Sequence, residues 1–149
     1  MPAPVVIVNR VAIARPPSDV WRLIVDWERS DRWMEDVSDV RVTTGHREGL
    51  GVEAVAAVRI AGITTRDRIR VTRWEPPHRL EIDHLGWVRG HAVMDLAATA
   101  PGTALTWEER FVPPWGVLGA LGMRVFVPVM RRVFRRDIER LRTLAEGGG

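Results

Sequence analysis

Three ionisable residues, Asp67, His84 and Glu109, occupy the apolar phase of stretches in which polar and apolar residues alternate as in β-strands. The apolar residues that share their phases are Ile69 and Val71, Leu80 and Ile82, and Leu105, Trp107 and Phe111, respectively. A polar group buried on such a face without a partner costs roughly 1–3 kcal/mol, so each needs a hydrogen bond or a ligand. An acid and a histidine at the polar end of a pocket could act as general acid and base in enolisation or dehydration. We therefore predict Asp67, His84 and Glu109 as candidate catalytic residues.

A structural role is the alternative for these residues: one or two of them would form buried ion pairs with Arg73 or Arg110, or would lie at a strand bulge where the predicted phase does not hold. A metal site is not predicted. The chain has no cysteine, and His78 lies in a turn while His84 and His91 have different strand phases. The sequence also lacks the nucleophile-elbow, P-loop and dinucleotide-binding motifs, so we expect no cofactor.

The elements that must position these residues are mostly strands. Alternation and the glycine- and proline-rich turns between the stretches predict strands over residues 5–14, 37–44, 51–60, 63–74, 79–85, 88–98 and 103–112. Two short helices are expected at 16–25 and 26–33, between the first and second strands. In the first strand we expect Val6, Val8, Val11 and Ile13 to point inward, with a slip in the alternation near Asn9.

Residues 117–146 predict one long amphipathic helix, because apolar residues recur three or four apart and arginines fill the positions between them. Pro128 lacks a backbone donor and clashes with the preceding turn, so we expect a kink or break there. The part before Pro128 is apolar nearly all round. It is either a mobile lid over a cavity, spanning about 115–127, or the buried start of the helix.

A strongly bent antiparallel sheet that grips a single helix leaves a volume that small side chains do not fill. Ala54, Ala56, Ala92 and Ala98 have predicted inward phases, which favours a pocket over a solid core. For Trp107 and Met94, packing in the hydrophobic core is a simpler explanation than contact with a ligand. The candidate ligand-binding residues are Trp33, Val58, Ile69, Met94, Trp107, Trp115, Met123, Phe126 and Met130.

Composition bounds the class of protein. The chain has 149 residues, 46% of them hydrophobic, which predicts one domain over 1–149 with a core of about 5–146. We see no signal peptide and no apolar run that could span a membrane, so a cytoplasmic location is expected. All 22 basic residues are arginine, and the net charge of +3 does not favour nucleic acid. The outer arginines Arg66, Arg68 and Arg70 predict a solvated face, with contact to a membrane surface as the alternative. The oligomeric state is not indicated.

Several stretches resemble the START-like (SRPBCC) superfamily, and within it the polyketide cyclase/dehydrase and lipid-transport branch. They are the opening strand, PPSDVWRLIVDWERSDRW, EPPHRLEI, GTALTWEERFVPP and the terminal amphipathic helix. The resemblance covers about Val6 to Glu146. It implies an α+β helix-grip fold, in which a curved antiparallel sheet of about seven strands wraps around the long C-terminal helix.

Members of this superfamily bind hydrophobic or amphipathic molecules between sheet and helix, and some are aromatases or cyclases. The leading hypothesis is therefore binding, and transport, of a small hydrophobic ligand such as a lipid, quinone or polyketide. The alternative is a polyketide aromatase/cyclase in which Asp67, His84 and Glu109 transfer protons. A domain with a filled cavity that serves as an interaction partner is a third reading, and the sequence leaves open whether the protein is an enzyme.

Overall fold

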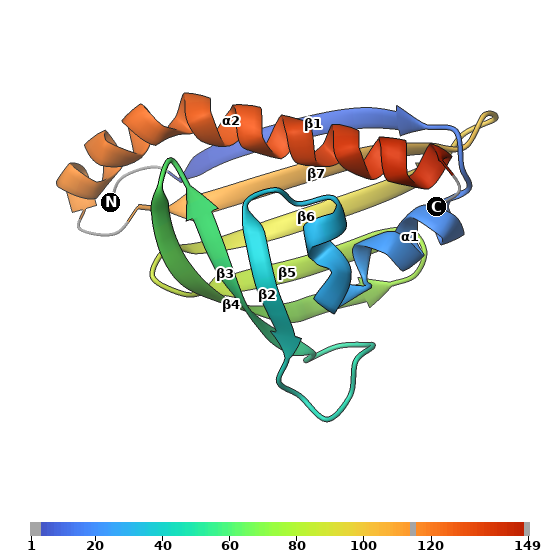
Figure 1. The fold of residues 1–149 in the computed structure, drawn as a ribbon, viewed down its shortest axis with the longest axis horizontal. Coiled ribbons are helices and arrows are strands. Elements are labelled where there is room, and N and C mark those ends of the chain that lie inside the picture. The colour runs from blue at the N-terminus through green and yellow to red at the C-terminus, as the bar shows by residue number, and fades with distance from the viewer. Residues whose placement is uncertain (1–3, 114–115, 148–149) are drawn as a thin grey trace.

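Seven antiparallel strands form one curved sheet in the computed structural model, which describes residues 4–113 and 116–147 (Figure 1). The order across the sheet is β1-β7-β6-β5-β4-β3-β2, so β1 pairs with the last strand and lies at the opposite edge from β2. The strands are β1 (Val5–Ile13), β2 (Val37–Val42), β3 (Glu53–Ile60), β4 (Ile63–Glu75), β5 (Arg79–Leu85), β6 (Arg89–Ala98) and β7 (Thr103–Val112). The strands predicted over 79–85 and 103–112 are observed with those bounds. The ends of the other five strands differ from their predicted positions by at most two residues.

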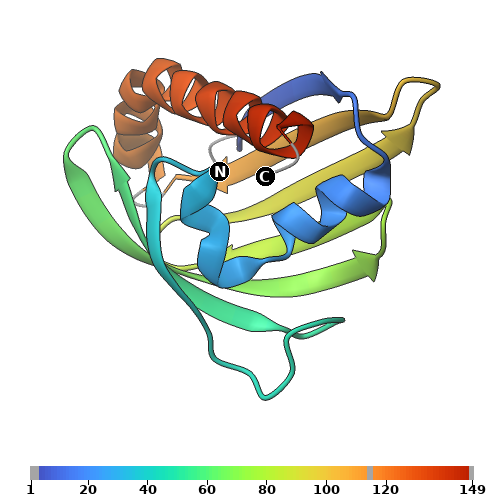
Figure 2. The ribbon, with the colours of Figure 1, turned by 45° about the vertical axis from the view of Figure 1, so that its right-hand side comes forward.

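Three helices complete the fold of the described residues. The short helix α1 (Pro17–Ile24) and the 3-10 helix η1 (Trp27–Arg32) carry the chain from β1 to β2, and α2 (Gly116–Glu146) lies on the concave side of the sheet (Figure 2). The predicted α+β helix-grip fold is therefore confirmed. Among the helices within residues 4–113 and 116–147, none combines the length and the apolar composition needed to cross a membrane.

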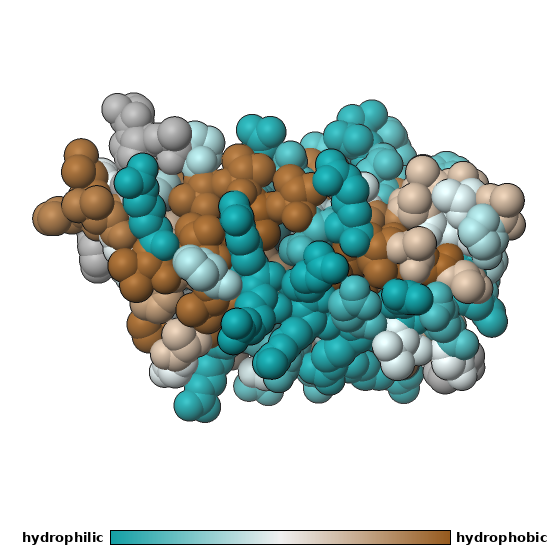
Figure 3. Space-filling view, turned by 90° about the horizontal axis from the view of Figure 1, so that it is seen from above, coloured by the Kyte–Doolittle hydropathy of each residue, from teal (hydrophilic) through white to brown (hydrophobic). Residues whose placement is uncertain are grey.

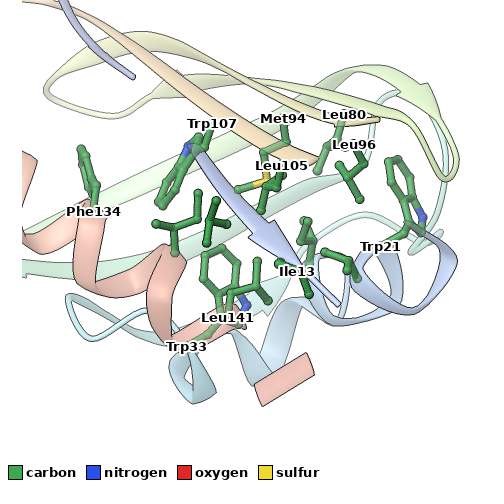
Figure 4. Close-up of a cluster of buried hydrophobic side chains, with 14 of the residues drawn as sticks. Ile13, Trp21, Trp33, Leu80, Met94, Leu96, Leu105, Trp107, Phe134 and Leu141 are labelled. Atoms are coloured by element: carbon green, nitrogen blue, oxygen red, sulfur yellow. The ribbon is translucent and has the colours of Figure 1, made fainter. Parts of the chain in front are cut away.

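The apolar stripe of α2 packs against the inner face of the sheet. Its buried residues are Met130, Phe134, Ile138, Leu141 and Ala145. The ring of Trp107 on β7 lies 5.2 Å from that of Phe134 and 5.9 Å from that of Trp33, which follows η1 (Figure 4). Full burial of one such side chain contributes about 1.5–3 kcal/mol, so this stripe holds the second half of α2 firmly on the sheet.

The first strand differs from the prediction. β1 pairs with β7 without interruption, from Val5 opposite Phe111 to Ile13 opposite Thr103. The alternation therefore has no slip: Ile7, Asn9, Val11 and Ile13 point inward and are buried. The inward placement of Val6 and Val8 was wrong, because the polar Asn9 occupies a core position, at 8% exposure, where an apolar residue was assumed.

The last helix is continuous through Pro128. Figure 2 shows its N-terminal part, in orange, turning away from the axis of the remainder, as expected for a proline that removes one backbone hydrogen bond. Val117, Leu118, Leu121 and Val125 in this part are exposed, and apolar side chains gather at this end of the molecule (Figure 3). The start of α2 thus has one face toward the sheet and another, also apolar, toward solvent.

A buried carboxyl group on α2 joins this helix to the loop before β2. Asp137 has no exposed surface, and its Oδ1 accepts a 3.0 Å hydrogen bond from the backbone N–H of Glu35. The neighbouring Asp36 side chain is also buried. Burial and the hydrogen bond with Asp36 raise the pKa of Asp137 to about 9. The neutral, protonated form of Asp137 is therefore the one that fits this contact at neutral pH.

Replacing Asp137 by asparagine should make stability less dependent on pH. The amide of Asp137→Asn copies the protonated acid, because its oxygen can accept from Glu35 and its NH₂ can donate to Asp36. The folded wild type, with a pKa of about 9, holds one more proton than the unfolded chain, whose aspartates titrate near 4, so its stability falls as pH rises from about 4 to about 9. We expect Asp137→Asn to be more stable than wild type at pH 8, by on the order of 1–3 kcal/mol, and this advantage to shrink toward pH 5.

Urea unfolding at pH 5, 6.5 and 8 would measure this difference. Glu139→Gln is a matched control, because Glu139 lies on the same helix with a half-exposed side chain that pairs with Arg142. Equal loss of stability in Asp137→Asn at pH 5 and pH 8 would contradict the assignment of a protonated Asp137.

Candidate functional site

A cavity of about 390 Å³ lies between the concave face of the sheet and α2. Its walls come from the inner faces of β2 to β7, from α1 and η1, and from the first half of α2, and they are mostly apolar. Ala54, Ala56 and Ala92 line it as predicted, whereas Ala98 lies at the exposed end of β6. The volume is within the range of sites that bind small molecules, roughly 300–1,000 Å³.

The predicted ligand-binding residues are brought together around this cavity. Those that line it are Trp33, Val58, Ile69, Met94, Trp107, Met123, Phe126 and Met130; Trp115 lies outside the described residues. Trp33 and Trp107 are 2% and 3% exposed, so most of each ring belongs to the core. Met123 and Phe126 are half-buried on the part of α2 before Pro128. The idea that 115–127 opens as a lid stays a prediction.

Asp67, His84 and Glu109 meet on one wall of the cavity. His84 Nδ1 lies 2.6 Å from Asp67 Oδ2, and its Nε2 lies 2.9 Å from Glu109 Oε2. The second oxygen of Glu109, Oε1, accepts a 3.0 Å hydrogen bond from the indole N–H of Trp107. Because an ionised carboxylate only accepts, this geometry requires both ring nitrogens of His84 to donate, which makes the ring an imidazolium.

The register of the sheet explains how His84 reaches a residue two strands away. His84 on β5 stands opposite Gly90 on β6, and Glu109 on β7 stands opposite Ala92 of β6. β5 and β7 are about 9–10 Å apart, so a side chain on β6 between them must be small for the two to touch. A Cβ at Gly90 would lie 2.3 Å from the carbonyl oxygen of Arg110, so the backbone there leaves no room for any side chain. Because Gly90 and Ala92 are small, no side chain on β6 lies between the His84 ring and Glu109.

The charge on His84 is stabilised by its two partners. The side chains of His84, Asp67 and Glu109 are 14%, 18% and 6% exposed. Burial disfavours the charged imidazole, but the charge of Glu109 and the hydrogen bonds to Asp67 and Glu109 outweigh it and raise the pKa of His84 to about 10. With two carboxylates and one imidazolium, the cluster carries a net charge of −1.

A second histidine on the sheet provides a comparison. His91 on β6 faces the other side of the sheet and bridges Asp83 at 2.7 Å and Glu81 at 2.9 Å. Burial opposes its charge, but the hydrogen bonds to Asp83 and Glu81 raise the pKa of His91 as well. Its side chain is 34% exposed, so that pair of contacts belongs to the outer surface, whereas the His84 cluster faces the cavity.

The predicted alternative of buried ion pairs with arginine was wrong. Arg73 pairs with Glu75 and Glu81, and Arg110 pairs with Glu108 on the outer face. Trp107 as the hydrogen-bond donor to Glu109 was also missed, although the two residues share a strand phase two positions apart. Within residues 4–113 and 116–147, no cluster of three His, Asp or Glu side chains is arranged to hold a metal ion.

The match to a family model covers nearly the whole chain. Residues 4–146 match the family described as "Polyketide cyclase / dehydrase and lipid transport", and the chain belongs to this family. No curated protein sequence matches the chain.

Solved structures share the fold at low sequence identity. A protein from Thermus thermophilus, TTHA0849, matches with a TM-score of 0.83 and 17% identity over 97% of this chain and 99% of that one. The Zhui aromatase/cyclase from Streptomyces sp. R1128 matches with a TM-score of 0.82 and 16% identity, over 96% of this chain and 94% of its own. At such identities these likenesses establish the fold, and the chemistry of the site must be argued from the residues of this chain.

The charge state of His84 can be tested by replacing one partner. In wild type at pH 7.5, nitrogen-detected NMR should show protons on both ring nitrogens of His84. Glu109→Gln removes the negative charge that contributes most to raising the pKa of His84 but keeps an oxygen that can accept, so this pKa should fall from about 10 to about 9 or below. Glu108→Gln, one residue away on the outer face of β7, should leave that pKa unchanged. A neutral His84 ring in wild type at pH 7.5, or an equal fall in both variants, would contradict the bridging role of Glu109.

Proposed function

We propose that the protein binds a small, largely apolar molecule in the cavity between the sheet and α2. The observation that carries this proposal is a cavity of about 390 Å³ with mostly apolar walls and the buried Asp67–His84–Glu109 cluster on one of them. The apolar walls would supply affinity by removing ligand surface from water, and the Asp67–His84–Glu109 cluster would orient the ligand. The description of the family, which includes lipid transport, supports the same conclusion.

The cavity is a built feature of the fold and not a packing defect. The small side chains of Ala54 and Ala56 on β3 and of Ala92 on β6 leave space above the sheet, which is part of the cavity. The far wall, around Met123 and Phe126, belongs to the part of α2 that also exposes apolar residues to solvent. The side chains that line an empty apolar cavity of this size lack packing contacts in the free protein, and a bound ligand would supply them.

Catalysis is a second candidate, and one observation favours it: the three ionisable groups share one wall of the cavity, and their charges are matched to each other and not to an arginine. The similar Zhui protein is described as an aromatase/cyclase. Both nitrogens of His84 are committed to carboxylates, so Asp67 is the residue that would take a proton from a carbon next to a carbonyl. In dehydration the same carboxyl would return that proton to the departing hydroxyl.

Native mass spectrometry of the purified protein tests binding directly. We expect wild type to carry an apolar molecule in near-stoichiometric amount, and Ala56→Phe to lose it because the ring would fill the cavity. Ala57→Phe is the matched control, because the adjacent residue faces the outer side of β3, opposite Arg66. Failure of the wild-type protein to retain or take up any molecule from a mixed lipid and aromatic extract would contradict the proposal, as would equal loss in both variants.

The two candidates differ in what Asp67→Asn should carry. If the protein only binds its ligand, the variant will hold the same molecule as wild type, in equal or smaller amount. If Asp67 transfers protons, the variant will accumulate a different molecule, the unreacted precursor. Extraction and mass analysis of the molecules bound to the two proteins would distinguish the outcomes, with Asp83→Asn on the outer face of β5 as control.

A further inference from the structure

We propose that the polar end of the cavity selects ligands that donate a hydrogen bond. It would accept an apolar molecule bearing a hydroxyl or ammonium group, and reject one whose inward group is a carboxylate, a phosphate or a quinone carbonyl. This inference rests on the proposed function, because it names the chemical class of the molecule held in the same cavity. It follows from where the donors and acceptors of the cluster point.

The donors of the cluster are all used within it. His84 donates from Nδ1 to Asp67 and from Nε2 to Glu109, and the Trp107 indole N–H donates to the other oxygen of Glu109. The hydroxyl of Ser30, which also lines the cavity, donates to the carbonyl oxygen of Trp27 at 2.7 Å. A ligand group that can only accept would therefore find no free hydrogen on the Asp67–His84–Glu109 cluster itself, and its oxygen would lose there the water it had in solution. The Thr65 hydroxyl and the Trp33 indole N–H also belong to residues that line the cavity, but they lie outside this cluster, and the indole nitrogen is buried.

One acceptor remains open. Within the described residues, no group donates to Asp67 Oδ1, because the contact with His84 uses Oδ2. The Asp67 side chain lines the cavity and is 18% exposed, so Oδ1 is accessible to a ligand. Gly86 lies beside this oxygen, and a Cβ there would approach it to 2.9 Å. The absence of a side chain at Gly86 keeps Oδ1 approachable.

The charges around the cavity favour the same class of ligand. The cluster has a net charge of −1, and it lies among apolar walls where charges are weakly screened. Arg66 also lines the cavity, but it is exposed and has the opposite strand phase from Asp67, so its guanidinium does not offset the cluster from within. An anionic head group would therefore meet repulsion at this wall, whereas a neutral hydroxyl or a cation would not.

This arrangement ranks the ligand types that the fold could hold. A phenolic polyketide, a hydroquinone and an apolar alcohol or amine all present an O–H or N–H to Asp67. A fatty-acid carboxylate presents only acceptors and a negative charge, and a quinone presents only acceptors. The oxidised and reduced forms of one quinone should thus bind differently, the reduced form more tightly.

Three naphthalene probes of nearly equal size test the ranking: 2-naphthol, 2-naphthoate and 1,4-naphthoquinone. The chain has neither cysteine nor lysine, so its side chains offer no thiol or amine to consume the quinone. Isothermal titration calorimetry at pH 7.5 should give a dissociation constant for 2-naphthol that is about tenfold or more below those of the other two probes. Ala56→Phe should abolish heat from all three, which places the binding in the cavity.

The variant Asp67→Asn should narrow the preference for 2-naphthol to about threefold or less, because the amide can both donate and accept. Asp83→Asn makes the same change in charge and shape on the outer face of β5 and should keep the full preference. Binding of 2-naphthoate or the quinone as tightly as 2-naphthol would overturn this inference while leaving the proposed function intact. No binding of any probe, together with an empty protein in native mass spectrometry, would overturn the proposed function and this inference with it.

Discussion

One imidazolium held between two carboxylates is the interaction on which the candidate site depends. Bringing these charges out of water is costly, and such a cluster is tolerated only when every charge is matched and hydrogen-bonded. His84 meets this condition by reaching Asp67 on the adjacent strand and Glu109 two strands away. The contact with Glu109 requires small residues, Gly90 and Ala92, on the strand between. The second oxygen of Glu109 accepts a hydrogen bond from Trp107. Loss of His84 or of either carboxylate would leave a buried charge without its partner.

The position of α2 determines how much space remains above that cluster. The apolar stripe after Pro128 holds the helix on the sheet, and the Asp137 contact ties it to the loop that contains Asp36. Both buried groups fit the protein in their protonated forms: the pKa of Asp137 is raised to about 9 and that of His84 to about 10. Since each is raised above its unfolded value, each contribution to stability declines with increasing pH, between about 4 and 9 for Asp137 and between about 6.5 and 10 for His84.

Local periodicity was enough to predict the strands, the long helix and the inward orientation of the three ionisable residues, while the helix-grip arrangement was implied by the resemblance to the START-like superfamily. Alternation with period two places Asp67, His84 and Glu109 on the concave face whichever strands pair, so this part of the site could be predicted. Their partners could not, because the contact of His84 with Glu109 depends on the register of three strands. Asp36 and Asp137 meet only through the docking of α2. The first half of β1 could not be predicted from hydrophobicity alone. Its pairing with β7 buries the polar Asn9 and turns Val6 and Val8 outward.

The family description spans catalysis and transport, so the choice between them rests on single atoms of this chain. Two of the four carboxylate oxygens in the cluster accept from His84 and a third accepts from Trp107, which leaves Asp67 Oδ1. A carrier needs that oxygen as a fixed acceptor for a ligand hydroxyl, and a cyclase needs it as a base. A hydroxyl held there would block proton abstraction from carbon, whereas a C–H bond directed at it would leave the ligand's hydroxyl without a partner. The group that a bound ligand presents to Asp67 Oδ1 therefore decides between the two functions.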